Sequence, residues 1–154
     1  MDAVKRDGIP YELIEKALPT IEGEVNDILA QMVDFGIVLE MDGKNINTYL
    51  AYDDDNVWPL ELSSGMERFI SSLAMRVGLI NVCNLPRANF LAIDEGFGNM
   101  DSDNLNSVYM LFQYLKSQFQ FAFVVSHIES MRDTVDSLLE ITKINDFSEL
   151  RFTD

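Results

Sequence analysis

The sequence lacks the glycine-rich phosphate loop, G-x-x-x-x-G-K-[ST], with which Mg-nucleotide sites normally hold their phosphates. Its only Gly-Lys dipeptide, Gly43-Lys44, lies in a stretch typical of a hairpin turn and has none of the upstream spacing of that loop. The absence excludes a phosphate loop supplied by these 154 residues themselves.

Positive charge is also scarce: 11 Lys and Arg stand against 26 Asp and Glu, a formal net charge of -15. Such a chain repels a phosphate backbone, so by itself it should bind nucleic acid poorly. Cys83 is the only cysteine, which excludes an internal disulfide and suits a reducing compartment. No apolar run approaches the roughly 20 residues of a membrane span, and the first residues lack the apolar core of a signal peptide, so we expect a cytoplasmic protein with no membrane partner.

In the first half of the sequence, apolar residues are spaced first as in helices and then as in strands. We predict two helices, opened by Pro10 and by Pro19, with the second ending near Met32. A hairpin of strands 37–41 and 46–52 follows, and an acidic loop comes after it.

The second half predicts an α/β fold with parallel strands. A long helix should run from Ser64 to about Val82. The elements expected after it are a strand at 90–93, a helix at about 103–117, a strand at 121–125, a short helix at about 129–135 and a strand around 137–144. Strands that are apolar throughout and separated by helices indicate a parallel sheet covered on both faces, within one domain.

Two adjacent carboxylates, Asp94 and Glu95, follow the apolar strand 90–93. Ligands of open α/β sheets bind beyond the carboxyl ends of the strands. An Asp there can hold Mg²⁺, and a neighbouring Glu can orient and deprotonate an attacking water. An acidic strand end exposed to solvent explains the pair less well, because four apolar residues precede it and G-F-G-N-M-D follows.

Further polar residues follow or precede the same elements. Ser126 and the only histidine, His127, follow the strand 121–125, where His127 would either touch a phosphate or serve as a capping or packing residue. Asp101 and Asp103 precede a helix, and we expect Asp103 to cap it.

Ser64 and Gly65 stand at the start of the long helix. Backbone N–H groups at a helix start and a serine hydroxyl suit a phosphate. Taken alone, Ser64 with Glu67 three residues later is an ordinary capping box.

Taken in order, LSSGMERFISSLA, FLAIDEGFGNMD and FVVSHIESM resemble three motifs of the ABC-type ATPase heads of the SMC superfamily: the signature motif, Walker B with its D-loop, and the switch histidine. The resemblance is greatest to the SbcC type, the ATPase of a double-strand-break repair nuclease complex. It implies the C-terminal lobe of a P-loop-NTPase head, a mainly parallel sheet flanked by helices. Residues 1–34 would return from a coiled coil, 35–61 would form a hairpin and acidic loop, and 62–154 would carry the three motifs. The phosphate loop would then lie in a separate N-terminal lobe.

The resemblance assigns roles to particular residues. It implies that Asp94 coordinates Mg²⁺, Glu95 is the catalytic base, Asp101 is the D-loop aspartate and His127 senses the γ-phosphate of ATP. The signature residues, aligned on the acidic position, are Ser64, Gly65, Met66 and Glu67. This signature departs from the usual L-S-G-G-E, since Met66 replaces a glycine; taking Ser63 as the signature serine instead shifts the following helix by one residue.

The implied partners are the N-terminal lobe of the same protein, a second copy of the head that sandwiches ATP, a metallophosphoesterase-type nuclease, and DNA bound through the complete complex. The isolated chain should be inactive, and a bacterial protein of this kind would be associated with the nucleoid. One alternative is a condensin-like ATPase that organises chromosomes without a nuclease. Another is a nuclease or topoisomerase-like metal site built from Asp94, Glu95, Asp101 and Asp103. A third is a docking domain that keeps only the fold.

Overall fold

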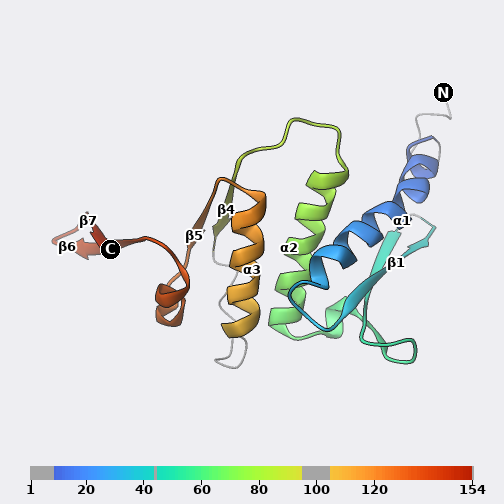
Figure 1. Ribbon diagram of the computed structural model, residues 1–154, viewed down its shortest axis with the longest axis horizontal. Helices are drawn as coiled ribbons and strands as arrows, with labels where there is room; N and C mark the ends of the chain where they lie inside the picture. The colour runs from blue at the N-terminus through green and yellow to red at the C-terminus, as the bar shows by residue number, and fades with distance from the viewer. Residues whose placement is uncertain (1–8, 44, 95–104, 154) are drawn as a thin grey trace.

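The computed structural model describes residues 9–43, 45–94 and 105–153 (Figure 1). The elements are α1 (Ile9–Leu29), β1 (Gly36–Asp42), β2 (Asn45–Ala51), β3 (Val57–Pro59), the 3-10 helix η2 (Leu60–Leu62), α2 (Gly65–Val82), β4 (Phe90–Asp94), α3 (Leu105–Gln118), β5 (Phe121–Val125), the 3-10 helix η4 (Glu129–Thr134), β6 (Leu138–Ile144) and β7 (Phe147–Thr153). The strands form an antiparallel sheet in the order β1-β2-β3, a parallel pair β4–β5 and an antiparallel hairpin β6–β7. The α/β fold class is therefore confirmed.

One continuous helix, α1, replaces the two helices expected at the N-terminal end. Pro19 lies inside it rather than opening a second helix. An interior proline removes one backbone donor, but its ring lies on the exposed side of α1. On the opposite side of α1, Val25, Ile28 and Leu29 are buried in the core. Tertiary packing thus outweighs the local preference of proline for a helix start.

The core lies between α1, α2 and α3, with the hairpin strands β1 and β2 packed on the α1 side. Helices α1 and α2 approach each other closely at Gly78, where an added Cβ atom would lie 2.8 Å from Cγ2 of Val25. Val25 is fully buried, so its side chain has no free space into which to move. Glycine at this position is therefore required by packing.

Gly78→Ala should lower the free energy of unfolding by about 1–2 kcal/mol, because overpacking against Val25 exceeds the helix propensity that alanine gains. Gly23→Ala is the matched control, since Gly23 lies inside α1 and a Cβ atom there would have no neighbour within 4 Å. We expect the control to gain about 0.5–1 kcal/mol. Urea unfolding of both variants measures the difference, and equal stabilities would contradict the packing argument.

The predicted hairpin is confirmed, with β1 and β2 paired from Gly36–Ala51 to Asp42–Asn45. Gly43 adopts a φ of 57° in the turn, a conformation that glycine accepts without strain. The free edge of β1 is occupied by side chains of α1. Asn26 donates to the carbonyl of Ile37 (2.9 Å) and accepts from its N–H (2.7 Å), and Glu22 accepts from the N–H of Leu39 (2.7 Å). These bonds fasten the hairpin to the end of α1.

Strand β3 lies in the segment expected to be an acidic loop. It pairs with β2 through Val57, Trp58 and Pro59. The strand is short and ends in proline, which is tolerated at the edge of a sheet because no ladder donor is needed there. A three-residue edge strand of this kind leaves no periodic signal in the sequence.

The parallel pairing of β4 with β5 confirms the predicted strands, but among residues 9–43, 45–94 and 105–153 helices cover only one face of the pair. Alternate residues point away from α3, and Phe90 and Phe121 stack there with ring centroids 5.5 Å apart. Phe121 and Phe123 remain 56% and 52% exposed. The expectation of a sheet covered on both faces is therefore wrong for this chain. We call these exposed side chains, Phe90, Phe121, Phe123 and Val125, the bare face.

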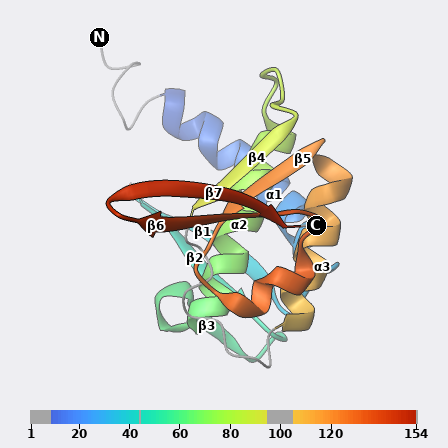
Figure 2. The same ribbon diagram turned by 90° about the vertical axis from the view of Figure 1, so that its left-hand side faces the viewer.

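Strand β6 was predicted, whereas β7 was not. The two are joined by Asn145 and Asp146, both with positive φ, as in the tight two-residue turns of β-hairpins. One side of the hairpin brings together Ile141, Leu150 and Phe152, each at least 66% exposed. Figures 1 and 2 show this hairpin on the side of β4 and β5 away from the three helices. The bare face and the exposed hairpin thus lie on one side of the molecule.

Candidate functional site

The carboxyl edge of the parallel pair brings two predicted site residues to neighbouring strands. Asp94 is the last residue of β4 and lies in register with Val125, the last residue of β5, after which Ser126 and His127 follow. The side chains of Asp94 and His127 are both exposed. Asp94 and His127 thus follow the carboxyl ends of neighbouring parallel strands, while the roles of both residues stay predictions. Glu95, Asp101 and Asp103 lie outside the described residues, so their places at this edge stay predictions.

A carboxylate at the end of β4 has the oxygen chemistry that Mg²⁺ prefers, so Asp94 fits the metal-binding role predicted for it. Within residues 9–43, 45–94 and 105–153, no group of three or more His, Cys, Asp or Glu side chains is arranged to hold a metal ion. Of the four carboxylates in the nuclease-like alternative, only Asp94 belongs to this part of the chain.

The start of α2 forms the predicted capping box. Ser64 is the N-cap, and its Oγ accepts a hydrogen bond from the N–H of Glu67 at 3.3 Å. In return, the N–H of Ser64 donates to Oε2 of Glu67 at 2.7 Å. Because the hydroxyl acts as an acceptor in this box, its proton remains available to another acceptor. The box fixes Ser64 at the positive end of α2.

Ser63 is oriented differently. It follows η2, and its hydroxyl donates to the carbonyl of Leu60 at 2.6 Å. Its own carbonyl accepts from Nη2 of Arg68 at 2.8 Å. Ser63 thus closes the preceding turn while Ser64 starts the helix, and this geometry favours the register in which Ser64 is the signature serine.

Met66, which replaces a glycine of the usual signature, points into the protein. Its side chain is only 6% exposed and belongs to the core together with Ile70. The bulk of the side chain is therefore directed away from solvent, and only the backbone of Met66 is left to approach a ligand. The replacement of a glycine by Met66 therefore leaves no bulky side chain at the surface of this turn.

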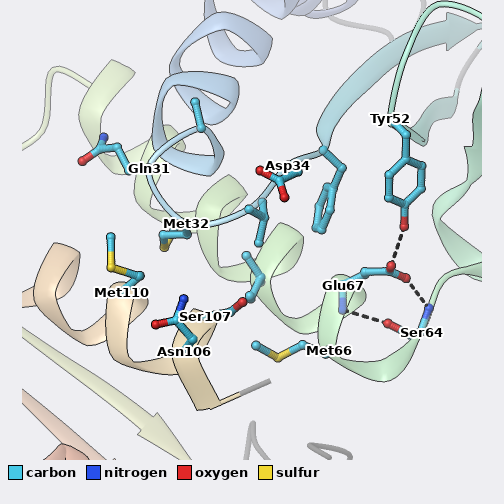
Figure 3. A pocket seen from close by; sticks show the side chains of 14 residues that line it. Gln31, Met32, Asp34, Tyr52, Ser64, Met66, Glu67, Asn106, Ser107 and Met110 are labelled. Carbon is cyan, nitrogen blue, oxygen red and sulfur yellow. Dashed lines mark hydrogen bonds between the residues drawn. The ribbon is translucent and has the colours of Figure 1, made fainter. Parts of the chain in front are cut away.

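A surface pocket of about 540 Å³ lies beside the capping box (Figure 3). It is formed by the segment that joins α1 to β1, the residue that follows β2, and the first turns of α2 and α3. Its lining includes Asp34, Tyr52, Glu67, Asn106 and Ser107. The start of α2 and the carboxyl ends of β4 and β5 lie toward the same end of the molecule in both views of the ribbon.

Tyr52 is the residue of this region that the sequence did not single out. It follows β2, and its hydroxyl donates a hydrogen bond to Oε1 of Glu67. That bond, followed by burial and the negative charge of Glu67, raises the pKa of Tyr52 to about 12. Burial by itself would raise the pKa of Glu67, but hydrogen bonds from Tyr52 and Ser64 outweigh it and lower that pKa overall. Glu67 is thus held as a carboxylate from both sides.

Several known proteins share sequence with this chain, while no protein-family model matches it. The uncharacterized protein R555 of Acanthamoeba polyphaga mimivirus is 33% identical over 160 residues, covering 94% of this chain and 12% of that protein. A DNA double-strand break repair Rad50 ATPase of Methanococcus maripaludis is 27% identical, covering 97% of this chain and 15% of that protein. The SbcC component of the nuclease SbcCD of Staphylococcus haemolyticus is 30% identical over 93 residues, covering 58% and 9%. The chain therefore spans a small part of each relative.

Solved structures share its fold. A chain from a study of ATP-driven dimerization and DNA-stimulated activation of SMC ATPases superimposes with a TM-score of 0.75 at 15% identity, covering 93% of this chain and 89% of that one. An SMC head bound to the C-winged helix domain of ScpA gives a TM-score of 0.71 at 17% identity, covering 96% of this chain but 47% of that one. The fold of this chain is thus that of part of an SMC ATPase head.

Proposed function

We propose that this chain, a relative of the SbcC and Rad50 ATPases with the fold of an SMC ATPase head, is the C-terminal lobe of a DNA-repair ATPase head. An N-terminal lobe would supply the phosphate loop. The heads would bind ATP between them, and hydrolysis would gate access to DNA or to a nuclease partner.

The observation that carries this proposal is the bare face beside the edge that holds Asp94. A two-stranded sheet is marginally stable in water unless another layer covers it, and α3 supports only one side of β4 and β5. The aromatic residues Phe90, Phe121 and Phe123 are about half exposed on the other side. A second lobe packed on them would place a phosphate loop next to Asp94.

Each predicted residue has one task in the completed head. Asp94 would hold Mg²⁺, which neutralises phosphate charge when bound, and Glu95 would take a proton from the attacking water. His127, from the end of β5, would contact the γ-phosphate. Asp101 and the start of α2 would face the second head, where the Ser64 hydroxyl and the amides of Gly65 and Met66 donate to ATP held by the other head.

The divisions of the chain follow from the same proposal. Residues 1–34 would join a coiled coil, 35–61 would brace the signature motif, and 62–154 would carry the nucleotide-facing motifs.

The DNA-repair type is favoured over the condensin-like type, because the sequence relatives described above with named activities are Rad50 and SbcC, whereas the SMC heads share the fold. A metallophosphoesterase-type nuclease is the partner that this type implies, and the cytoplasm is its compartment. The helices within residues 9–43, 45–94 and 105–153 include no candidate membrane span.

The isolated chain should hydrolyse ATP negligibly, and adding its N-terminal lobe should restore turnover, because most groups that hold the β- and γ-phosphates lie in that lobe.

Phe121→Glu should abolish association of the two lobes by placing a charge on the bare face. Tyr109→Glu is the control, since Tyr109 is a similarly exposed aromatic residue on α3. Sedimentation of the mixed lobes and phosphate release measure both effects.

Two results would contradict the proposal. Robust ATP hydrolysis by the purified chain alone, abolished by Glu95→Gln, would mean that the chain holds a complete site. Cutting of DNA by the chain with Mg²⁺ or Mn²⁺, lost in Asp94→Ala, would instead favour the nuclease-like alternative.

A further inference from the structure

Glu67 links the start of α2 to the hairpin sheet. One carboxylate oxygen accepts from the N–H of Ser64, and the other accepts from the hydroxyl of Tyr52 (Figure 3). The capping box alone would satisfy Ser64, as it does at many helix starts. The additional bond from Tyr52 is a contact between elements, because it joins the end of β2 to α2.

Tyr52 is itself connected to α1. Its ring lies against that of Phe35, with centroids 5.8 Å apart and planes tilted by 59°. Phe35 stands between the end of α1 and the first residue of β1. The hydrogen bonds that Asn26 and Glu22 form with the backbone of β1 fasten it to α1 just beyond that point. A continuous series of contacts therefore runs from α1 through Phe35, Tyr52 and Glu67 to Ser64.

We propose that Tyr52 is a positioning residue for the signature motif, which sets the orientation of Ser64 through Glu67 and couples it to the position of α1. The inference rests on the proposed function for the role of Ser64, but the coupling itself is a property of these 154 residues. A displacement of α1, the segment expected to return from the coiled coil, would pass to the phosphate-facing end of α2. Tyr52 would touch no nucleotide.

Tyr52→Phe tests the coupling in the chain alone, because it removes the hydroxyl and keeps the ring beside Phe35. Backbone amide exchange at Ser64 should accelerate about tenfold, the low end of what a hydrogen bond to a charged group contributes. Tyr49→Phe, three residues earlier in β2, is the matched control and should change nothing at Ser64. In a Glu67→Ala background, Tyr52→Phe should have no further effect. Unchanged exchange at Ser64, or an effect that persists without Glu67, would overturn the inference.

Titration of Tyr52 gives a second test of the hydrogen bond to Glu67, because a mere loss of packing would not change the pKa of Tyr52 in this way. The folded-state pKa of Tyr52 is raised, so the stability contributed by its hydroxyl is complete below pH 10 and is lost as the pH rises toward about 12. In a titration of ring-labelled tyrosine followed by NMR, Glu67→Gln should lower the pKa of Tyr52 toward its ordinary value. A pKa of Tyr52 that is near 10 in the parent chain would overturn the bond on which the coupling depends.

The functional consequence is tested in the complete head. Tyr52→Phe should weaken ATP-dependent pairing of heads several-fold while ATP binding to a single head stays at the parental affinity. If the parent heads pair and Tyr52→Phe pairs equally well, the positioning role is wrong although the proposed function stands. If the parent heads do not pair with ATP, the proposed function fails and the role of Tyr52 in it fails too, whatever the exchange experiment gives for the bond itself.

Discussion

Glu95→Gln is expected to slow ATP hydrolysis by the completed head by roughly 10² to 10⁴, which is the usual contribution of a general base. The amide keeps the shape of the side chain but cannot take a proton from water. Nucleotide should still bind, because Asp94 would continue to hold Mg²⁺ at the end of β4. Paired heads with ATP between them should therefore accumulate. Single-turnover phosphate release and sedimentation with ATP measure the two effects.

Glu40→Gln is a suitable control for that experiment, since Glu40 is an exposed residue of β1, outside the predicted site. It loses a carboxylate in the same way and should hydrolyse ATP at the parental rate. Parental turnover in Glu95→Gln as well would show that Glu95 is only a solvated residue after the strand.

Ser64→Arg is expected to abolish ATP-dependent pairing of heads while leaving ATP binding to each head nearly intact. Ser64 is exposed at the N-cap of α2, so the fold should lose only about 1 kcal/mol from the cap. The long side chain would fill the space where the phosphate of the opposite head meets the helix. Sedimentation with and without ATP measures pairing, and a binding titration on the single head measures affinity.

Two matched variants separate the effect of losing the helix cap from the effect of the added bulk. Ser64→Ala removes the cap without adding bulk, and Ser63→Arg adds the same bulk at the residue that closes η2, so both should be milder. Mixing supplies a further check: a head with Ser64→Arg and a head without its phosphate-loop lysine should form one intact composite site when they pair with each other, and none when each pairs with its own kind. If heads with Ser64→Arg pair normally in the presence of ATP, the stretch LSSGME is only a helix cap and not a signature motif.

The sequence predicted those elements whose own residues determine them. The long helix α2 carries its cap, its acidic N3 residue and its apolar period within one stretch, and it was predicted to within one residue. Strand β5 is a short apolar run bounded by polar residues, and its bounds agree with the prediction. Parallel pairing then brought Asp94 and His127 to one edge, as expected from the general behaviour of such sheets.

What escaped prediction depends on contacts between distant residues. The continuity of α1 through Pro19 is maintained by packing on α2, which the local sequence does not encode. Strand β3 exists because β2 offers it an edge, and β7 follows a turn at Asn145 and Asp146 that lacks the usual glycine. Tyr52 acquires its partner across 15 positions of sequence, so no spacing rule points to Glu67.

The exposed aromatic surface of β4 and β5 should affect how much of this protein accumulates in a cell. Apolar patches and thin, uncovered sheets attract chaperones and proteases, and they associate with one another when concentrated. This surface would therefore be open to proteases and to self-association until the N-terminal lobe of the same protein packs on it, and docking of that lobe would protect it. The time between synthesis of β5 and docking of the N-terminal lobe would then set how much newly made protein is lost.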